Sequence, residues 1–291
     1  MEVRRTYSAA VVCAVLAAAL FALSTPFSKL FLSEVSPLMM AAFLYLGAGF
    51  GMGGFWLVKR AAGVRSSEMP LGRADAPYAV LMILLDIAAP ISLMFGLTMT
   101  TAANASLLNN FEIVTTALIA LMIFKEVISK RLWFAILLVT IASILLSVED
   151  FSTITFSAGS IFVLAACVFW GFENNCTRMM AEKDPLEIVI LKGIFSGAGA
   201  LLIAMFAGEA LPAAGLALLV LLLGFVSYGL SIFFYVYAQR TLGAAKTSTY
   251  YAIAPFLSVV FSLVIFHEMP HAVFLAALAV MGIGVYFASG K

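Results

Sequence analysis

The chain of 291 residues is 64% hydrophobic and only 11% charged, with a mean hydropathy of +1.12, whereas a soluble domain carries about a quarter charged residues. Its apolar residues form blocks of roughly twenty, the length that crosses a bilayer core, which excludes a soluble protein; their continuity excludes an outer-membrane barrel, whose strands alternate apolar and polar residues. The apolar blocks make the lipid bilayer an expected partner, and because no basic aromatic patch is present, we expect no nucleic acid as a partner.

Ten apolar blocks follow one another along the chain, and each predicts a transmembrane helix, so the predicted fold class is an all-α polytopic membrane protein. The blocks lie at residues 8–32, 37–58, 77–97, 104–124, 132–148, 158–180, 186–207, 213–238, 247–266 and 272–289. Arginines before the first block are also typical of a signal peptide. However, Leu16-Ala17-Ala18 recurs 148 positions later as Leu164-Ala165-Ala166, and we expect a segment that is duplicated in mid-chain to belong to the mature protein.

Two long stretches, Asn104 to Glu126 and Lys246 to Glu268, resemble each other at an offset of 142 positions. The shift superposes Phe124 on Phe266 and the glutamate two residues later on its counterpart. Similarity at a fixed offset indicates internal duplication. The sequence therefore predicts two five-helix repeats, at residues 1–150 and 151–291.

Lysine and arginine predict the topology. With a cytoplasmic amino terminus and ten spans, 14 of the 16 basic residues fall at cytoplasmic ends of spans, as the positive-inside rule requires. The other two are Lys29 and Lys192, and we expect Lys192 near the cytoplasmic interface. Five spans per repeat require opposite orientations, and the basic FKEVISKR of the first repeat becomes FHEMPHAV in the second. The charges thus predict inverted-topology repeats in the cytoplasmic (inner) membrane, with both termini cytoplasmic.

At these residues the chain resembles the drug/metabolite transporter superfamily, in its EamA-type branch. The matching features are Ser36-Pro37-Leu38 after the first block and ASLLNNFEIVTTALIALMIFKEVISKRLWFAILLVTIASILL of the first repeat. The family usually has Glu-Pro inside this span; here the pair is Glu112-Ile113 in one repeat and Ala254-Pro255 in the other. The resemblance implies an ATP-independent exporter, as in relatives that export aromatic and other neutral amino acids. It also implies that spans one, three, four, six, eight and nine line a central cavity and that spans five and ten are peripheral.

Inverted repeats are typical of secondary transporters, which bind substrate near the midplane of the membrane. We therefore expect a secondary transporter, not an enzyme, that exports amino acids or similar small metabolites by alternating access. The expected partner is a small-molecule substrate, with protons as a candidate coupling ion, no cofactor, and a monomer or weak dimer as the assembly. An exporter of drugs or other metabolites and a channel-like facilitator of the same fold remain alternatives.

Polar residues at membrane depth are costly and mark functional sites. The candidate substrate-binding residues are polar or aromatic residues of the third, fourth, sixth, eighth and ninth spans: Asp86, Asn109, Asn110, Glu112, Trp170, Glu173, Tyr228, Tyr250 and Tyr251. The carboxylates either bind an ammonium group or a proton, or pair structurally with other polar groups. The aromatic residues either line the site or form part of an interfacial belt. For Asp86, proton coupling and ammonium binding both remain open.

One motif points elsewhere. The segment His267-Glu268-Met269-Pro270-His271 fits H-E-x-x-H, which places two zinc ligands on one face of a helix in metalloproteases. It gives a remote alternative, an intramembrane metalloenzyme. Because Pro270 disrupts the helix that this geometry requires, we expect no catalytic residue and no metal site here.

Overall fold

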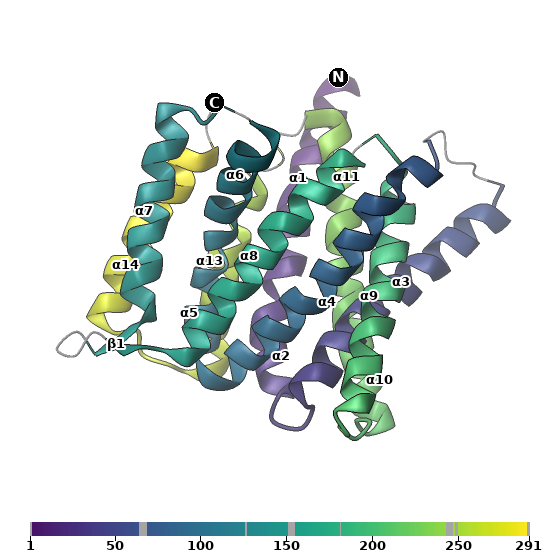
Figure 1. The fold of residues 1–291 in the computed structure, drawn as a ribbon. Helices are drawn as coiled ribbons and strands as arrows, with labels where there is room; N and C mark the ends of the chain where they lie inside the picture. Colours follow the sequence, from purple (N-terminus) through teal and green to yellow (C-terminus); the bar gives the residue numbers. More distant parts are fainter. Residues whose placement is uncertain are drawn as a thin grey trace.

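The computed structural model describes residues 2–63, 69–125, 127–150, 155–180, 182–242, 247 and 250–289, and these are largely helical (Figure 1). The helices of the first half are α1 (Glu2–Ala22), α2 (Ser24–Phe31), α3 (Pro37–Ala61), the 3₁₀ turn η1 (Arg73–Asp75), α4 (Ala76–Met99), α5 (Ala102–Leu108), α6 (Phe111–Phe124) and α7 (Lys130–Ser147). Those of the second half are α8 (Ala158–Met179), α9 (Pro185–Phe206), α10 (Ala214–Gly224), the π-helix η2 (Phe225–Leu230), α11 (Ser231–Leu242), α13 (Ala254–Phe266) and α14 (Ala272–Ser289). Between the halves, β1 (Val148–Asp150) pairs antiparallel with β2 (Thr155–Phe156).

By length and composition, seven helical segments in the described ranges can cross a membrane. They are Tyr7–Phe31, Pro37–Ala61, Arg73–Met99, Ala102–Ile123, Lys130–Ser147, Pro185–Phe206 and Ala214–Ala238. Two shorter helices, α13 and Ala272–Ala288, are also apolar. The 22 residues of α8 include a glutamate and two asparagines, which lower the hydropathy of this helix. The chain is therefore a multi-pass helical membrane protein, and the count of ten crossings stays a prediction.

The helices fall on the ten predicted blocks, but several blocks are not continuous α-helices. The first is divided at Leu23, between α1 and α2. The fourth is divided at Asn109 and Asn110, between α5 and α6, and the ninth has a turn at Ala252 and Ile253 before α13. The eighth contains the π-helix η2. These interruptions were not predicted, because the hydropathy of a block reports its length and not where its backbone deviates.

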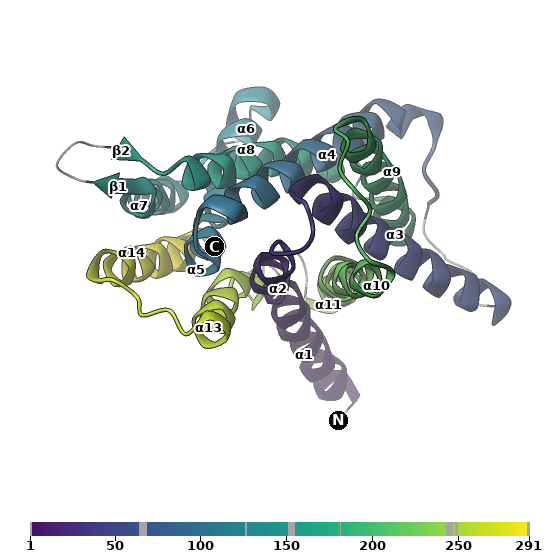
Figure 2. The ribbon, with the colours of Figure 1, turned by 90° about the horizontal axis from the view of Figure 1, so that it is seen from below.

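Two helix ends have the same unusual geometry. Lys125 after α6 and His267 after α13 have left-handed backbone, with φ of 58° and 51°, a conformation that terminates helices and is uncommon outside glycine. They are 142 positions apart, as are the first residues of α7 and α14. The loop after α6 lies at the same end of the bundle as the chain termini, and the loop after α13 lies at the opposite end (Figures 1 and 2). The sequence offset therefore also relates these parts of the fold.

Close packing of α3 on α9 depends on glycine. A Cβ atom added at Gly193 would lie 2.6 Å from the Cα of Gly49, and one added at Gly197 would lie 2.6 Å from the backbone nitrogen of Leu46. Both distances are too short for a side chain, so the two backbones touch directly. Such crossings through small residues are typical of membrane helices.

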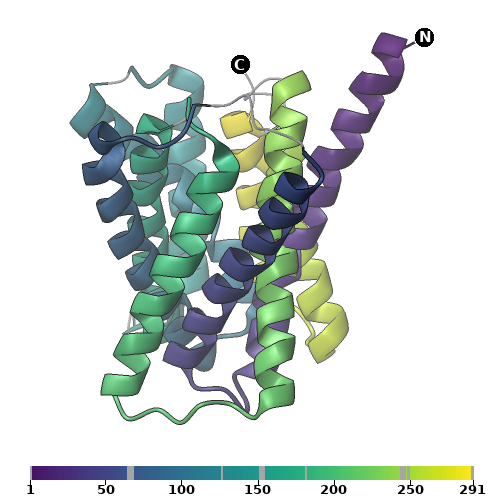
Figure 3. The same ribbon diagram turned by 90° about the vertical axis from the view of Figure 1, so that its right-hand side faces the viewer.

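Packing between elements far apart in sequence holds the bundle together. At one edge α7 lies beside α14 (Figure 2), and Arg131 Nε of α7 donates to the carbonyl of Phe287 in α14 at 3.0 Å. The hydroxyls of Ser106 in α5 and Ser258 in α13 are 2.8 Å apart. On another side the tilted α1 packs against α11 (Figure 3). The position of α7 and α14 at the edge of the bundle agrees with the peripheral position expected for spans five and ten.

Candidate functional site

A buried cluster of charged groups joins three helices, and a tyrosine from a fourth helix binds it. The ammonium of Lys192 in α9 lies 3.0 Å from Asp86 Oδ2 in α4 and 3.1 Å from Glu173 Oε1 in α8. The exposed fractions of these three side chains are 15%, 0% and 4%. The hydroxyl of Tyr45 in α3 donates to Asp86 Oδ1 at 2.8 Å, and Thr177 Oγ1 donates to Glu173 Oε1. We call Asp86, Glu173 and Lys192 the charged cluster.

Local sequence explains why these groups meet. Pro90 lies inside α4, four residues after Asp86, and cannot donate to the Asp86 carbonyl because it has no N–H. On the opposite helix, a Cβ at Gly193 would lie 2.9 Å from the Tyr45 carbonyl oxygen, so α9 lies against α3 at this level. The neighbouring residue, Lys192, can therefore reach the aspartate that Tyr45 also binds.

A second polar group links α6 to α8. Asn174 Nδ2 donates to Glu112 Oε1 at 2.5 Å and to Thr116 Oγ1 at 3.2 Å. The next residue, Asn175, donates to the carbonyls of Thr116 at 3.2 Å and Gly171 at 2.8 Å. Glu112 is thus bound to an amide of the facing helix. This contact favours structural pairing for Glu112 and leaves its role in substrate binding a prediction.

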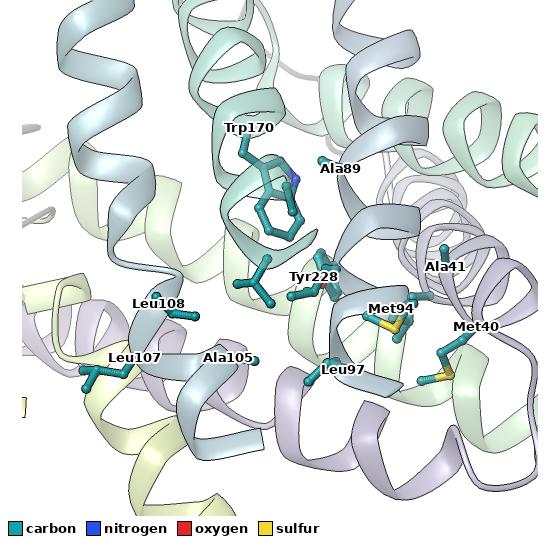
Figure 4. Packing of buried hydrophobic residues seen from close by; sticks show 14 of the residues in the cluster. Met40, Ala41, Ala89, Met94, Leu97, Ala105, Leu107, Leu108, Trp170 and Tyr228 are labelled. Atoms are coloured by element: carbon teal, nitrogen blue, oxygen red, sulfur yellow. The ribbon is translucent and has the colours of Figure 1, made fainter. Parts of the chain in front are cut away.

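Aromatic side chains form a row that begins at the charged cluster. Consecutive members have ring centroids 5.0–5.8 Å apart. The row consists of Tyr45, Tyr228, Phe21, Tyr251 and Tyr235. At its start, Trp170 Nε1 donates to the Tyr45 hydroxyl at 3.4 Å. Trp170 and Tyr228 also lie among buried apolar residues of α3, α4 and α5 (Figure 4), so the row gives a largely apolar, π-rich surface next to the charges.

Corresponding segments of the two halves are interrupted close to these residues. The break between α5 and α6 falls at Asn109 and Asn110, and the break before α13 at Ala252 and Ile253. The Asn109 Oδ1 atom is buried and accepts no hydrogen bond from the described residues, whereas Asn110 Nδ2 donates to the carbonyl of Leu107 at 3.0 Å. Interrupted segments at matching positions of two repeats are the best sequence-level pointer to a transporter's binding site.

The predicted site residues are only partly brought together. Asp86 and Glu173 both pair with Lys192. Trp170 and Tyr228 contact Tyr45, which in turn binds Asp86. Tyr251 lies further along the row, while Asn110 donates back to the carbonyl of Leu107 in α5. Tyr250 is apart from the cluster: it packs against a small hydrophobic group formed by residues of α1 and α11. Asn109, Glu112 and Tyr250 therefore stay candidates without a shown link to the charges.

The ion pairs of Lys192 were not predicted, and its expected position near the cytoplasmic interface stays a prediction. The residue lies two turns inside α9, which begins at Pro185, and it forms ion pairs with Asp86 and Glu173. The two carboxylates offset the cost of burying the ammonium. Because both lie on other helices, the sequence of α9 alone does not reveal them. A buried aspartate without a nearby cation is itself a signal that a lysine from another span belongs beside it. Tyr45 was missed because a tyrosine in an apolar span is usually packing.

The histidine motif does not form the geometry of a zinc site. α13 ends at Phe266, His267 has left-handed backbone, and α14 begins only at Ala272. The two histidines therefore lie in a loop and do not share a helical face. Among the described residues, no group of three histidine, cysteine or acidic side chains has the arrangement of a metal site.

Comparisons with known proteins agree with this architecture. The pattern of the EamA-like transporter family matches residues 8–148 and 157–290. The chain is 27% identical over 274 residues to an "Uncharacterized transporter" of Methanothermobacter thermautotrophicus, covering 85% of this chain and 76% of the relative. It is 23% identical over 239 residues to "Uncharacterized transporter YyaM" of Bacillus subtilis, covering 78% and 77%.

One solved structure, described as "Crystal structure of protein", has a TM-score of 0.65 with this chain at 19% identity. The superposition covers 97% of this chain and 95% of the other. This likeness shows that the two chains share a fold along nearly their whole length.

Proposed function

Because the chain belongs to the EamA-like transporter family and is a multi-pass membrane protein, we propose that it exports amino acids or similar small metabolites across the cytoplasmic membrane. In this proposal it is a secondary transporter that works by alternating access. The observation that carries the proposal is the charged cluster, buried between α4, α8 and α9 beside a row of aromatic rings. Transport of this kind makes and breaks no covalent bond and needs neither cofactor nor metal.

The proposed architecture has ten membrane helices in two inverted five-helix repeats, residues 1–150 and 151–291. Three observations support it. The family pattern matches two segments, one in each half. The ends of α6 and α13 share left-handed geometry at an offset of 142 residues. The loops that follow them lie at opposite ends of the bundle (Figure 1), as opposite orientations of the repeats require. In this arrangement both termini are cytoplasmic.

The composition of the charged cluster supports a substrate with an ammonium group. Two carboxylates face one lysine, and a third carboxylate, Glu112, lies on the neighbouring helix α6. An excess of acidic groups in an apolar interior favours cations and disfavours anions. The aromatic row suits an apolar or aromatic moiety and attracts cations at its ring faces. Zwitterionic amino acids fit both features, whereas sugar phosphates require clamps of lysine or arginine.

The experiment that tests the proposed function is uptake by the purified protein in proteoliposomes. The labelled panel contains neutral amino acids, a nucleoside, a cationic drug and a sugar phosphate, with protein-free liposomes as the control. We expect saturable uptake of neutral amino acids and competition among them. Preferred uptake of the sugar phosphate contradicts the proposed substrate class, and preferred uptake of the drug assigns the chain to the alternative group of exporters.

A further inference from the structure

We propose that, without substrate, the ammonium of Lys192 occupies the position between Asp86 and Glu173 that the substrate's ammonium takes during transport. The substrate displaces the lysine, which then binds the substrate's carboxylate. This inference rests on the proposed function and narrows it to one class of substrate. The substrate must carry both a primary ammonium and a carboxylate close together. Lys192 thereby becomes a specificity-determining residue.

The first argument is the identity of the functional group. The Lys192 ammonium lies within 3.1 Å of carboxylate oxygens from two different helices. A lysine ammonium and the ammonium of an amino acid have the same charge and the same three N–H donors. A position that binds the lysine ammonium therefore has the right charge and hydrogen-bond acceptors for the substrate ammonium, and the two groups compete for it.

The second argument is that the lysine binds the two acids with unequal geometry. Its ammonium donates a hydrogen bond to Glu173 Oε1 at 3.1 Å. Asp86 Oδ2 is fully buried and, although 3.0 Å from the same nitrogen, accepts no well-directed hydrogen bond from any residue that the structure describes. The ion pair offsets the burial of this oxygen, but a hydrogen bond weakens when it is poorly directed. A substrate ammonium that is free to orient can supply that donor.

The third argument is that both acids are held in place without the lysine. Tyr45 donates to the other oxygen of Asp86, and Thr177 donates to Glu173. The carboxylates therefore keep their orientation when Lys192 moves, which lowers the cost of binding an incoming group. Because two facing carboxylates without a cation are strongly unfavourable, the position exchanges one cation for another and is not left empty.

The fourth argument concerns mobility and charge balance. Of the three side chains, that of Lys192 is the most exposed, at 15%, and its four-carbon stem is flexible. A zwitterion leaves the net charge of the cluster unchanged, and it gives the displaced lysine a new partner. A simple amine leaves the lysine unpaired, and a simple carboxylate leaves the acids with an extra negative neighbour. Among these three kinds of ligand, a zwitterion is the one that leaves every charge with a partner of opposite sign.

The test uses three ligands that share a phenyl ring and the same carbon spacing and differ in their charged groups: L-phenylalanine, phenethylamine, which lacks the carboxylate, and 3-phenylpropanoate, which lacks the ammonium. Each is measured by the shift that it causes in the melting temperature of the purified protein. In the wild-type protein we expect phenylalanine to bind best. Lys192→Met keeps the stem and removes the charge; we expect phenylalanine to bind about tenfold more weakly, as for loss of a close charge pair, and phenethylamine to bind better than phenylalanine.

The matched control is Lys183→Met, because the ammonium of Lys183 forms a 3.2 Å ion pair with Asp75 outside the charged cluster. This variant should keep the wild-type order of ligands. In addition, ethylammonium chloride should raise the melting temperature of Lys192→Met more than sodium chloride does, and should not do so for Lys183→Met. An unchanged order in Lys192→Met, or equal effects of the two salts, overturns the proposal.

If Lys192→Met does not fold, Asp86→Asn serves as the second variant. It removes one of the two acids that hold the lysine and leaves Glu173 as its one carboxylate partner in the charged cluster, so 3-phenylpropanoate should gain affinity while phenylalanine loses it; an unchanged order overturns the proposal. A failure of the proposed function can be distinguished from a failure of this inference. If no amino acid binds or is taken up by the wild-type protein but ethylammonium still stabilises Lys192→Met, the ammonium position stands and amino-acid export does not.

Discussion

Asp86 is the residue whose role can be separated most sharply by substitution. It is fully buried and bound by Tyr45 and Lys192. Asp86→Asn keeps the size of the side chain and removes its charge. As a ligand of the substrate ammonium, Asp86 should be needed for both substrate counterflow and accumulation driven by a pH gradient, and we expect both rates to fall about tenfold or more.

The other outcomes assign different roles to Asp86. If counterflow persists and only pH-driven accumulation is lost, the residue couples protons to export. If both activities persist, Asp86 is not part of the site. The matched control is Asp75→Asn, since Asp75 pairs with Lys183 at the edge of the bundle and should leave both rates unchanged.

The polar residues of the site could be found in the sequence, but their partners could not. Asp86, Glu173 and Tyr228 stand out because charged and polar groups are costly in apolar spans. Which of them meet depends on the rotation of each helix about its axis, which close contacts such as that of Gly193 on Tyr45 decide. For this reason the pairing of Lys192 with Asp86 and Glu173 was not predicted.

Among the helices, the contact of α3 with α9 gives a prediction about stability. A Cβ at Gly49 would lie 2.6 Å from the backbone nitrogen of Ile194, whereas one at Gly53 would have no atom within 4 Å. Gly49→Ala should therefore destabilise the protein by about 1–3 kcal/mol, as overpacking does. Gly53→Ala, one turn further along the same helix, should be neutral or stabilising by up to about 1 kcal/mol, because alanine favours helix.

The measurement is the melting temperature of the two variants in detergent. Because Gly49→Ala pushes α9 away from α3, it should also weaken transport, since Lys192 lies next to the contact residue Gly193. Equal melting temperatures for the two alanine variants would show that α3 and α9 are not in backbone contact.

Element boundaries followed from the sequence more closely than backbone irregularities did. The predicted block at 272–289 coincides with α14, and α9 begins one residue before its predicted start. The turns at Asn109 and at Ala252, and the π-helix around Tyr228, interrupt blocks that were predicted as continuous helices. Hydropathy reports how long a segment stays apolar but not where its hydrogen bonding changes, and these changes fall in the segments that contain the candidate site.

For the whole molecule, the inverted-repeat proposal predicts the sides of two equivalent loops. Val127 and Met269 are 142 positions apart, and their side chains are 95% and 87% exposed. In a background with Cys13, Cys167 and Cys176 replaced by alanine, Met269→Cys in intact cells should react with an impermeant maleimide. Val127→Cys should react only after permeabilisation. Reaction of both, or the reverse pattern, would rule out opposite orientations of the two repeats.

The central claim is that this chain is a carrier, whose substrate site opens to one side of the membrane at a time. Counterflow tests it most directly. Proteoliposomes containing the protein are loaded with unlabelled phenylalanine and diluted into a trace of labelled phenylalanine without any ion gradient. A carrier predicts transient accumulation of label above its external concentration, absent when the interior is unloaded, because exchange is coupled through one site. Label that only equilibrates, at a rate independent of internal phenylalanine, would contradict alternating access and identify a channel-like facilitator.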